Sequence, residues 1–346
     1  MDIAELLAFT VKNNASDLHL SSGLPPMIRV DGDIRRLTLP ALDTAQLQEL
    51  IYSTMSDKHR RDFEANLEVD YSYSVQGLAR FRVNCFHHDR GVGGAFRTIP
   101  DSVWTLEDIG SPPIFRDIID APRGLILMTG PTGSGKSTTL AAMIDHLNNH
   151  VEGHVLTIED PIEFVHRSKK CVINQREIHR DTHGFNQALR AALREDPDII
   201  LVGEMRDLET IQSALRAAET GHLVMATLHT NDAVQSVDRI VDVFPGNEQS
   251  QIRFQLSMVL LAIVSQRLLP TADGEGRVLA YELMKNSTAV SNLIRDGKTH
   301  QVLSTMETSA KDGMITMDKC IKDLYVDGYI TYEEAVAHMR NPKELK

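Results

Sequence analysis

Cysteines are scarce in this sequence, and none stands at the spacing of a metal site. The 346 residues include three, Cys85, Cys171 and Cys320, and no two of them form a Cys-x-x-Cys pair. Such pairs are the usual mark of structural zinc or of a redox centre, and secreted disulfide scaffolds carry many more cysteines. Their absence excludes a disulfide framework and a cysteine-ligated zinc site, and it favours buried thiols in a reducing compartment.

Long apolar stretches and a surplus of positive charge are also missing. The longest apolar run, 258–264, is far shorter than the roughly 20 residues that a membrane-spanning helix needs. Residues 1–20 carry early acidic side chains and no basic segment, so we expect no signal peptide. The 36 Lys and Arg against 48 Asp and Glu give a net charge of −12, which argues against a nucleic-acid partner. We therefore expect a cytoplasmic protein without direct membrane insertion, which reaches a membrane only through partners.

The first part of the sequence, 1–98, has an α+β pattern. It opens with an amphipathic helix and continues with strand-like segments separated by glycines. The apolar positions of that helix are Ile3, Leu6, Leu7 and Val11. Residues 99–113 contain three prolines and little periodicity, so we interpret them as a linker.

The second part, 114–346, alternates short apolar runs with helical stretches. This pattern is typical of an α/β fold whose parallel sheet is buried on both faces. The runs are 124–129, 155–158, 199–202 and 223–226. The segment after about residue 250 is expected to be mostly helical, because apolar residues recur there at helical spacing. Those residues are Ile252, Leu256, Val259, Leu260 and Ile263.

The strongest motif is a glycine-rich loop of the pattern Gly-x-x-x-x-Gly-Lys-Ser. It lies between the apolar run 124–129 and a helical stretch, which is the context that a phosphate loop needs. Glycines let backbone N–H groups point at phosphate oxygens, and the following helix adds the positive end of its dipole. Lys136 can reach the β- and γ-phosphates, and the Ser137 hydroxyl can ligate a metal, so we predict ATP and Mg²⁺ as ligands. The nucleotide-binding residues are Gly130, Pro131, Thr132, Gly133, Ser134, Gly135, Lys136, Ser137 and Thr138.

A second apolar strand, 199–202, ends in Gly203 and Glu204 and looks like a Walker B strand. Gly203 stands where an Asp is usual, so Mg²⁺ is expected to rely on Ser137, phosphate oxygens and water. Glu204 would lie at the carboxyl end of a strand, where open α/β sheets place ligands, and can polarise a water for attack on the γ-phosphate. The alternative is an acid that stabilises a helix N-terminus.

Two more polar clusters follow apolar runs. Three carboxylates, Glu159, Asp160 and Glu163, would repel a nucleotide unless they hold Mg²⁺ or a water. His222 and His229 bracket the run 223–226, and a histidine near the γ-phosphate can sense it by donating a hydrogen bond. Structural histidines are the alternative to that interpretation.

Arginines alternate in the first part of the sequence. Period two puts Arg80, Arg82 and Asn84 on one face of a strand, and Arg97 lies on the next strand-like segment. Exposed strand charges are one interpretation. The other is that an arginine reaches the triphosphate of a neighbouring subunit, where it stabilises the charge that develops on the transferred phosphoryl group.

These motifs stand in long strings that resemble the retraction ATPases of bacterial type IV pili, in the secretion ATPase superfamily. The resemblance covers essentially the whole chain. In the terms of that family the strings include the Walker A motif, the Asp box, the Walker B motif and the His box. The matching segments are 15–32, 79–84, 130–143, 156–164, 192–211 and 217–230.

The resemblance implies a PAS-like N-terminal domain followed by a RecA-like ATPase domain with a helical C-terminal part. It also implies a ring of six subunits that hydrolyses ATP to retract pili in twitching motility. The implied partners are an inner-membrane pilus platform protein and a related accessory ATPase. By matching position it implies a catalytic Glu204, the Asp-box Glu163, the His-box residues His222 and His229, and the nucleotide-facing Arg82 and Arg97.

Pilus-assembly and type II secretion relatives are typically longer at the N-terminus and carry a tetracysteine element, which favours the retraction type here. The family's C-terminal motif resembles AIRNLIRE, whereas this sequence has Ser291 for its first arginine and Asp296 for its last glutamate. We expect Asn292, Arg295 and Asp296 to stay available to solvent or a partner. The residues expected to pack as one helical face are Ala289, Val290, Leu293 and Ile294.

Two alternatives to a retraction motor share these motifs. An accessory paralogue that assembles on the true motor is one, although an intact Lys136 and Glu204 weigh against an inactive subunit. A RecA-like nucleic-acid motor is the other, because fold alone does not fix function. The negative net charge and the lack of a basic, aromatic stacking surface argue against it.

Overall fold

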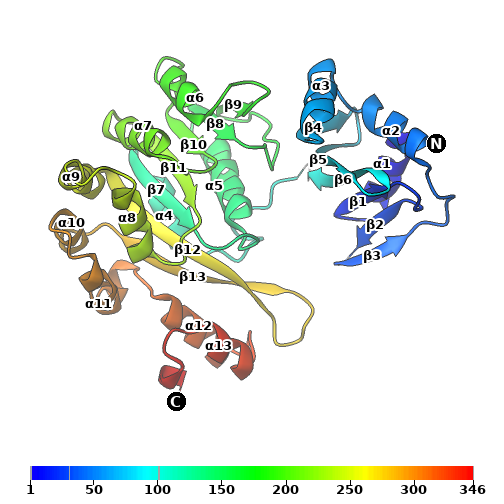
Figure 1. Cartoon of the computed structure of the whole chain (residues 1–346). Coiled ribbons are helices and arrows are strands. Elements are labelled where there is room, and N and C mark those ends of the chain that lie inside the picture. The colour runs from blue at the N-terminus through cyan, green and yellow to red at the C-terminus, as the bar shows by residue number, and fades with distance from the viewer. Residues whose placement is uncertain (1, 31, 100–101, 346) are drawn as a thin grey trace. The chain divides into compact units, whose positions relative to one another are not determined.

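The computed structural model describes residues 2–30, 32–99 and 102–345 (Figure 1). The chain divides into a first compact unit, Met1–Ser102 with Glu163–Val165, and a second one, Val103–Ile162 with His166–Lys346. Residues 100 and 101 of the expected linker lie outside the described residues, as does residue 31 of the matched segment 15–32.

The first unit is an antiparallel sheet with helices packed on it. Its helices are α1 (Ile3–Lys12), α2 (Thr44–Ser53) and α3 (Asp57–Asn66). The strands are β1 (Asp17–Ser21), β2 (Met27–Val30), β3 (Asp33–Arg36), β4 (Glu68–Val75), β5 (Ala79–His88) and β6 (Gly91–Ile99), in the order β3-β2-β1-β6-β5-β4. The amphipathic helix expected at the start is confirmed as α1, because Ile3, Leu6 and Leu7 are buried against Leu18 and Phe96. The PAS-like character of this unit stays a prediction.

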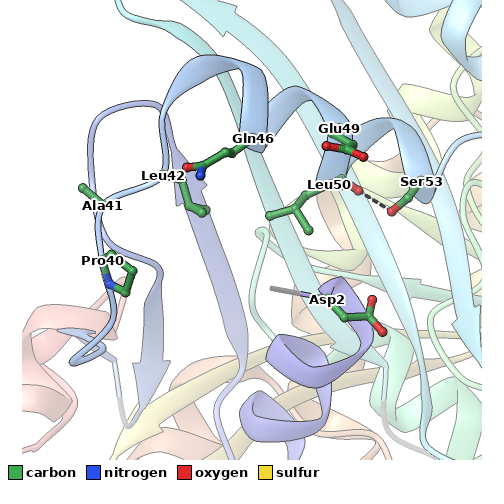
Figure 2. A pocket seen from close by; sticks show the side chains of 8 residues that line it. All are labelled: Asp2, Pro40, Ala41, Leu42, Gln46, Glu49, Leu50 and Ser53. Carbon is green, nitrogen blue, oxygen red and sulfur yellow. Dashed lines mark hydrogen bonds between the residues drawn. The ribbon is translucent and has the colours of Figure 1, made fainter.

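A pocket of about 670 Å³ lies on the first unit, at the start of α1 and along α2 (Figure 2). Asp2 caps α1 by accepting from the Ala4 N–H at 3.1 Å. None of the described residues that line the pocket is a lysine or an arginine, and a nucleotide needs positive charge. The lining residues are Asp2, Pro40, Ala41, Leu42, Gln46, Glu49, Leu50 and Ser53.

The second unit is built on a mostly parallel sheet with the order β13-β12-β7-β11-β10-β8-β9. The strands are β7 (Gly124–Thr129), β8 (His154–Glu159), β9 (Val172–Glu177), β10 (Ile199–Val202), β11 (Leu223–Leu228), β12 (Leu260–Pro270) and β13 (Arg277–Lys285). The first helices are α4 (Ile114–Ile119), α5 (Lys136–His150), α6 (Phe185–Ala192), α7 (Leu208–Glu219), α8 (Ala233–Asp242) and α9 (Gln249–Val259). The mixed α/β fold that the sequence predicts is thereby confirmed.

Alternate residues of β7 point into two separate cores. Leu125 and Leu127 belong to the core that includes α7 and α8, whereas Ile126 and Met128 belong to the core that includes α4 and α5. Both faces of the strand are therefore buried, which explains why its sequence is a continuous apolar run. This double burial fixes the loop after Thr129 at one edge of the sheet.

The expectation of a mostly helical segment after residue 250 is wrong for 260–285. Helix α9 ends at Val259, and Leu260 begins β12, which pairs in parallel with β7 and in antiparallel with β13. A buried strand is apolar on both faces, so its run of apolar residues continued the helical spacing of α9 without a visible break. Helices follow as α10 (Thr288–Arg295), η1 (Thr299–Gln301), α11 (Val302–Thr308), η2 (Ala310–Asp312), α12 (Met317–Val326), α13 (Tyr332–His338) and η3 (Pro342–Leu345).

Two expectations from composition concern the cysteines and membrane-spanning helices. Cys85, Cys171 and Cys320 are all buried free thiols, as expected. Among the helices of the described residues, none combines the length and the apolar character needed to cross a bilayer.

Candidate active site

The phosphate loop curls because its glycines adopt backbone angles that other residues avoid. Gly130, Gly133 and Gly135 have φ values of 137°, 79° and 85°. A side chain at Gly130 would also place its Cβ 2.3 Å from the carbonyl oxygen of Gln266 on β12. Both constraints, the positive φ and the close approach of β12, therefore require glycine at the start of the loop.

Lys136 and Ser137 lie in the first turn of α5, directly after the loop. The ammonium group of Lys136 is nearly buried and donates to the carbonyl oxygens of Gly130 at 2.8 Å and Pro131 at 2.9 Å. The Ser134 hydroxyl is buried and has no hydrogen-bond partner among the described residues. A positive charge, a helix N-terminus and an unsatisfied hydroxyl fit a polyphosphate.

Gly203 lies so close to the neighbouring strand that a side chain there would be crowded. Its N–H donates to the Ile158 carbonyl at 2.8 Å. A Cβ at this position would lie 3.2 Å from that same oxygen and 3.2 Å from the Cα of Glu159. A side chain here would be tight against backbone atoms, which disfavours the aspartate that usually stands at this Walker B position.

Glu204 lies just beyond β10, where its carboxylate contacts the side chains of Arg206 and His229. Its carboxylate is 2.7 Å from an Arg206 guanidinium nitrogen and 3.4 Å from His229 Nε2. Burial would raise the pKa of Glu204, but the hydrogen bond and charge of Arg206, helped by His229, outweigh burial and lower that pKa. Glu204 is therefore held as a carboxylate, the form that can accept a proton from water.

Strand order explains why His229 lies beside Glu204. β11 runs between β7 and β10 in parallel with both, so its carboxyl end lies between the phosphate loop and Glu204. The Thr227 hydroxyl donates to the Gly203 carbonyl, and the Met205 N–H donates to the Thr227 carbonyl at 3.1 Å. These bonds hold the segment after β10 against the end of β11.

His222 lies at the other end of the same strand. It precedes Leu223, the first residue of β11, and its Nδ1 is 2.9 Å from the Ala217 carbonyl. A six-residue strand spans about 17–20 Å, so the structure brings His229 to the phosphate loop and does not bring His222 there. A role for His222 in the reaction stays a prediction, because its side chain lies at the end of β11 that is far from the phosphate loop of the same chain.

The two glutamates of the expected Asp box lie in different surroundings. Glu159 ends β8, where its carboxylate accepts from the Thr157 hydroxyl at 2.6 Å and from the Gln175 amide at 3.2 Å. Glu163 belongs to Glu163–Val165, the short segment that groups with the first unit. Its part in the nucleotide site stays a prediction.

Arg82 and Arg97 are direct cross-strand neighbours in the first unit. They face each other across β5 and β6, and Asp17 on β1 is the next residue in the same row. The Arg97 Nε donates to the nearly buried Asp17 at 2.9 Å. Burial would raise the pKa of Asp17, but hydrogen bonds from Ser16 and Arg97 outweigh it and lower that pKa. The terminal nitrogens of Arg97 lie on an exposed side chain, beside Arg82 on the same face.

Two residues of this site were not predicted from the sequence. Gln266 donates its amide N–H to the Ser134 carbonyl at 2.6 Å and so holds the phosphate loop, but it lies on β12, which resembled a helix. Arg206 follows Glu204 by two residues, and that spacing was its only signal.

Comparison with known proteins agrees with this geometry. The family model described as type II/IV secretion system protein matches residues 2–309. This chain belongs to that family. It is 59% identical to the type IV pilus retraction ATPase PilT of Pseudomonas aeruginosa over 345 residues, 100% of each chain. It is 40% identical to the type IV pilus ATPase PilU of the same organism, over 100% of this chain and 91% of the relative.

A solved structure extends the match to three dimensions. The crystal structure of the pilus retraction motor PilT with bound ADP superposes with a TM-score of 0.93 at 50% identity, and the match covers 100% of this chain and 99% of the other. The fold of this chain is therefore that of the secretion ATPases.

Proposed function

We propose that this protein is an ATPase motor that drives the retraction of type IV pili. The observation that carries the proposal is the full-length identity of 59% to a retraction ATPase, joined to a phosphate loop and a carboxylate at one sheet edge. A relative that binds ADP on the same fold supports a nucleotide as the ligand.

Each residue at the sheet edge has a distinct part in this proposal. Lys136 binds the β- and γ-phosphates once they replace its bonds to the loop carbonyls, and Ser137 would hold Mg²⁺, which would neutralise phosphate charge. Glu204 accepts a proton from the attacking water. His229 contacts Glu204 and senses the γ-phosphate, so its ring links the two ends of the reacting centre.

The proposal includes an assembly of six identical subunits. Arg82 and Arg97 then face the nucleotide of a neighbouring subunit, where an arginine in trans stabilises the transition state. The expected domains are 1–98 and 114–346, with 99–113 as the linker. We place the ring at the cytoplasmic face of the inner membrane, on a pilus platform protein.

Deleting the gene and counting pili tests the direction of the motor. Loss of surface motility with excess surface pili supports retraction, whereas loss of pili contradicts it and indicates assembly. Complementation with Glu204→Gln should fail to restore motility, because the ring then binds nucleotide without turnover. Glu219→Gln is the matched control, since this exposed glutamate ends α7 away from the phosphate loop.

An accessory role is the second candidate, because identity to PilU also extends along the whole chain. The higher identity to PilT favours the main motor. In a strain that lacks only this gene, continued retraction at normal force would indicate the accessory role.

A further inference from the structure

Three charged side chains from distant parts of the second unit meet beside the loop that carries His229. Arg340, beyond α13, places a guanidinium nitrogen 3.0 Å from Asp232 and 3.8 Å from Glu282. Both carboxylates are buried. The match to the secretion-system family ends at residue 309, so Arg340 lies beyond the residues that the family match covers. We call Asp232, Glu282 and Arg340 the clasp.

Glu282 joins the beginnings of two helices. One of its oxygens accepts from the Ala233 N–H, in the first turn of α8, at 2.9 Å. The other accepts from the Met317 N–H, in the first turn of α12, at 3.4 Å. A carboxylate that is 2% exposed therefore ties the start of α8 to the C-terminal helices.

Asp232 connects the clasp to the nucleotide site. It is the N-cap of α8, accepting from the Gln235 N–H at 2.8 Å, and it follows His229 by three residues. Ser236 donates to the Asp232 carbonyl at 2.6 Å and also contacts the Thr230 hydroxyl at 2.6 Å. The segment 229–232 is thereby fixed to α8, so a shift of the cap moves His229.

The segment that carries Arg340 is itself held at two places. Asp318 accepts from the backbone N–H groups of Arg340 and Asn341, each at 2.8 Å. Arg267 on β12 donates to the His338 carbonyl at 3.1 Å, and its neighbour Gln266 holds the phosphate loop. The C-terminal segment therefore contacts Asp232, on the His229 side of the nucleotide site, and Arg267, next to the Gln266 that holds the phosphate loop.

We propose that Arg340 is a positioning residue that keeps His229 beside Glu204 by offsetting the negative charge of Asp232 and Glu282. Without the arginine, the two buried carboxylates lose the guanidinium nitrogen that both approach, and their repulsion displaces the start of α8. Burial raises the pKa of Glu282, the Ala233 N–H and the charge of Arg340 oppose that rise, and the charge of Asp232 adds to it. This inference rests on the proposed ATPase function.

The test compares turnover with nucleotide affinity in the full-length protein. Arg340→Ala should lower kcat for ATP by about two- to thirtyfold, the range expected for coupling through such a network. The Kd for ADP should stay within about twofold of the wild-type value, because the phosphate loop is untouched. Arg340→Lys should recover part of the loss, since it restores the charge without the planar fork.

Charge relief separates positioning from mere loss of packing. Adding Glu282→Gln to Arg340→Ala removes one of the two repelling charges, so the double variant should turn over faster than Arg340→Ala alone. Lys319→Ala is the control, because it breaks an exposed ion pair between Lys319 and Asp323, both on α12, and leaves the clasp intact. A double variant no faster than the single one, or an equal loss in the control, overturns the proposal.

Amide hydrogen exchange tests the clasp independently of ATP turnover. Peptides that cover 229–236 should exchange faster in Arg340→Ala than in wild type or Lys319→Ala. Unchanged exchange there contradicts the clasp. A wild-type protein that binds ADP without hydrolysing ATP contradicts the proposed function instead, so the two failures are distinguishable.

Discussion

Glu204 and His229 follow two neighbouring parallel strands, and 3.4 Å separates the carboxylate oxygen of one from Nε2 of the other. Arg206 contacts the same carboxylate from the opposite oxygen. The proposed base is therefore held between the Arg206 guanidinium and the His229 ring before any nucleotide binds. The protonation state of Glu204 therefore depends on Arg206, although Arg206 has no assigned part in binding phosphate.

Removing Arg206 should shift the pH dependence of hydrolysis. Arg206 is the main influence that offsets burial and lowers the pKa of Glu204, so that pKa rises in Arg206→Ala. The base works only when deprotonated, and the acid limb of the kcat profile should therefore move to higher pH. Arg206→Lys should shift the limb less. Profiles of wild type and Arg206→Ala that coincide would show that Glu204 is not the titrating base.

Adding a single methyl group at Gly203 should destabilise the second unit. Its Cβ would press against Ile158 and Glu159 backbone atoms at 3.2 Å, and overpacking of this kind costs about 1–3 kcal/mol. Chemical unfolding of Gly203→Ala measures the loss. Gly246→Ala is the control, because a Cβ there meets nothing within 4 Å. Equal stability of the two variants would refute the steric account of Gly203.

The phosphate loop was predictable because its chemistry is local. Gly130 to Ser137 are consecutive, and the strand and the helix that flank them have clear patterns. The pairing of Glu204 with His229 was less visible, since it depends on the order of β10 and β11 in the sheet. Sequence patterns indicate that strands exist, but they do not give the order in which strands pair.

Other features depend on contacts across long stretches of chain. β12 escaped detection because a strand buried on both faces has no alternation to distinguish it from an apolar helix. Gln266 was missed with it. Arg340 and Glu282 are 58 positions apart (340 − 282), and no motif links a C-terminal arginine to a carboxylate on β13.

Arginines acting between subunits should be revealed by mixing inactive variants. Arg82→Ala and Glu204→Gln subunits, mixed and reassembled, should recover some turnover, because certain interfaces combine a wild-type Arg82 with a wild-type Glu204. A mixture of Lys136→Ala and Glu204→Gln is the control and should stay inactive, since both groups belong to one subunit's site. No recovery in the first mixture, or a rate independent of protein concentration, argues against arginines in trans.

The helix α10 separates a packing face from an exposed one. The structure buries Val290 and Ile294 and half-buries Leu293, whereas Ala289 is exposed, which corrects the expectation that it packs. Ile294→Ala should cost about 2–5 kcal/mol of unfolding free energy, as for other large-to-small core changes.

Arg295→Ala should leave stability nearly unchanged, because its contact with Asn292, at 2.7 Å, is exposed. We expect this variant to keep ATPase activity and to impair retraction, because the residue stays available to a partner. Measuring both activities side by side decides the point. Equal loss of both, or loss of neither, would remove the coupling role.

The most direct test of the account is ATP turnover by purified Glu204→Gln beside the wild-type protein. We expect the variant to bind nucleotide with near-normal affinity and to hydrolyse ATP about 10²–10⁴ times more slowly, the usual contribution of a general base. Lys136→Ala should instead weaken binding as well, because it removes the cation that binds the phosphates. Hydrolysis by Glu204→Gln at the wild-type rate would contradict the assignment of the base and, with it, the proposed mechanism.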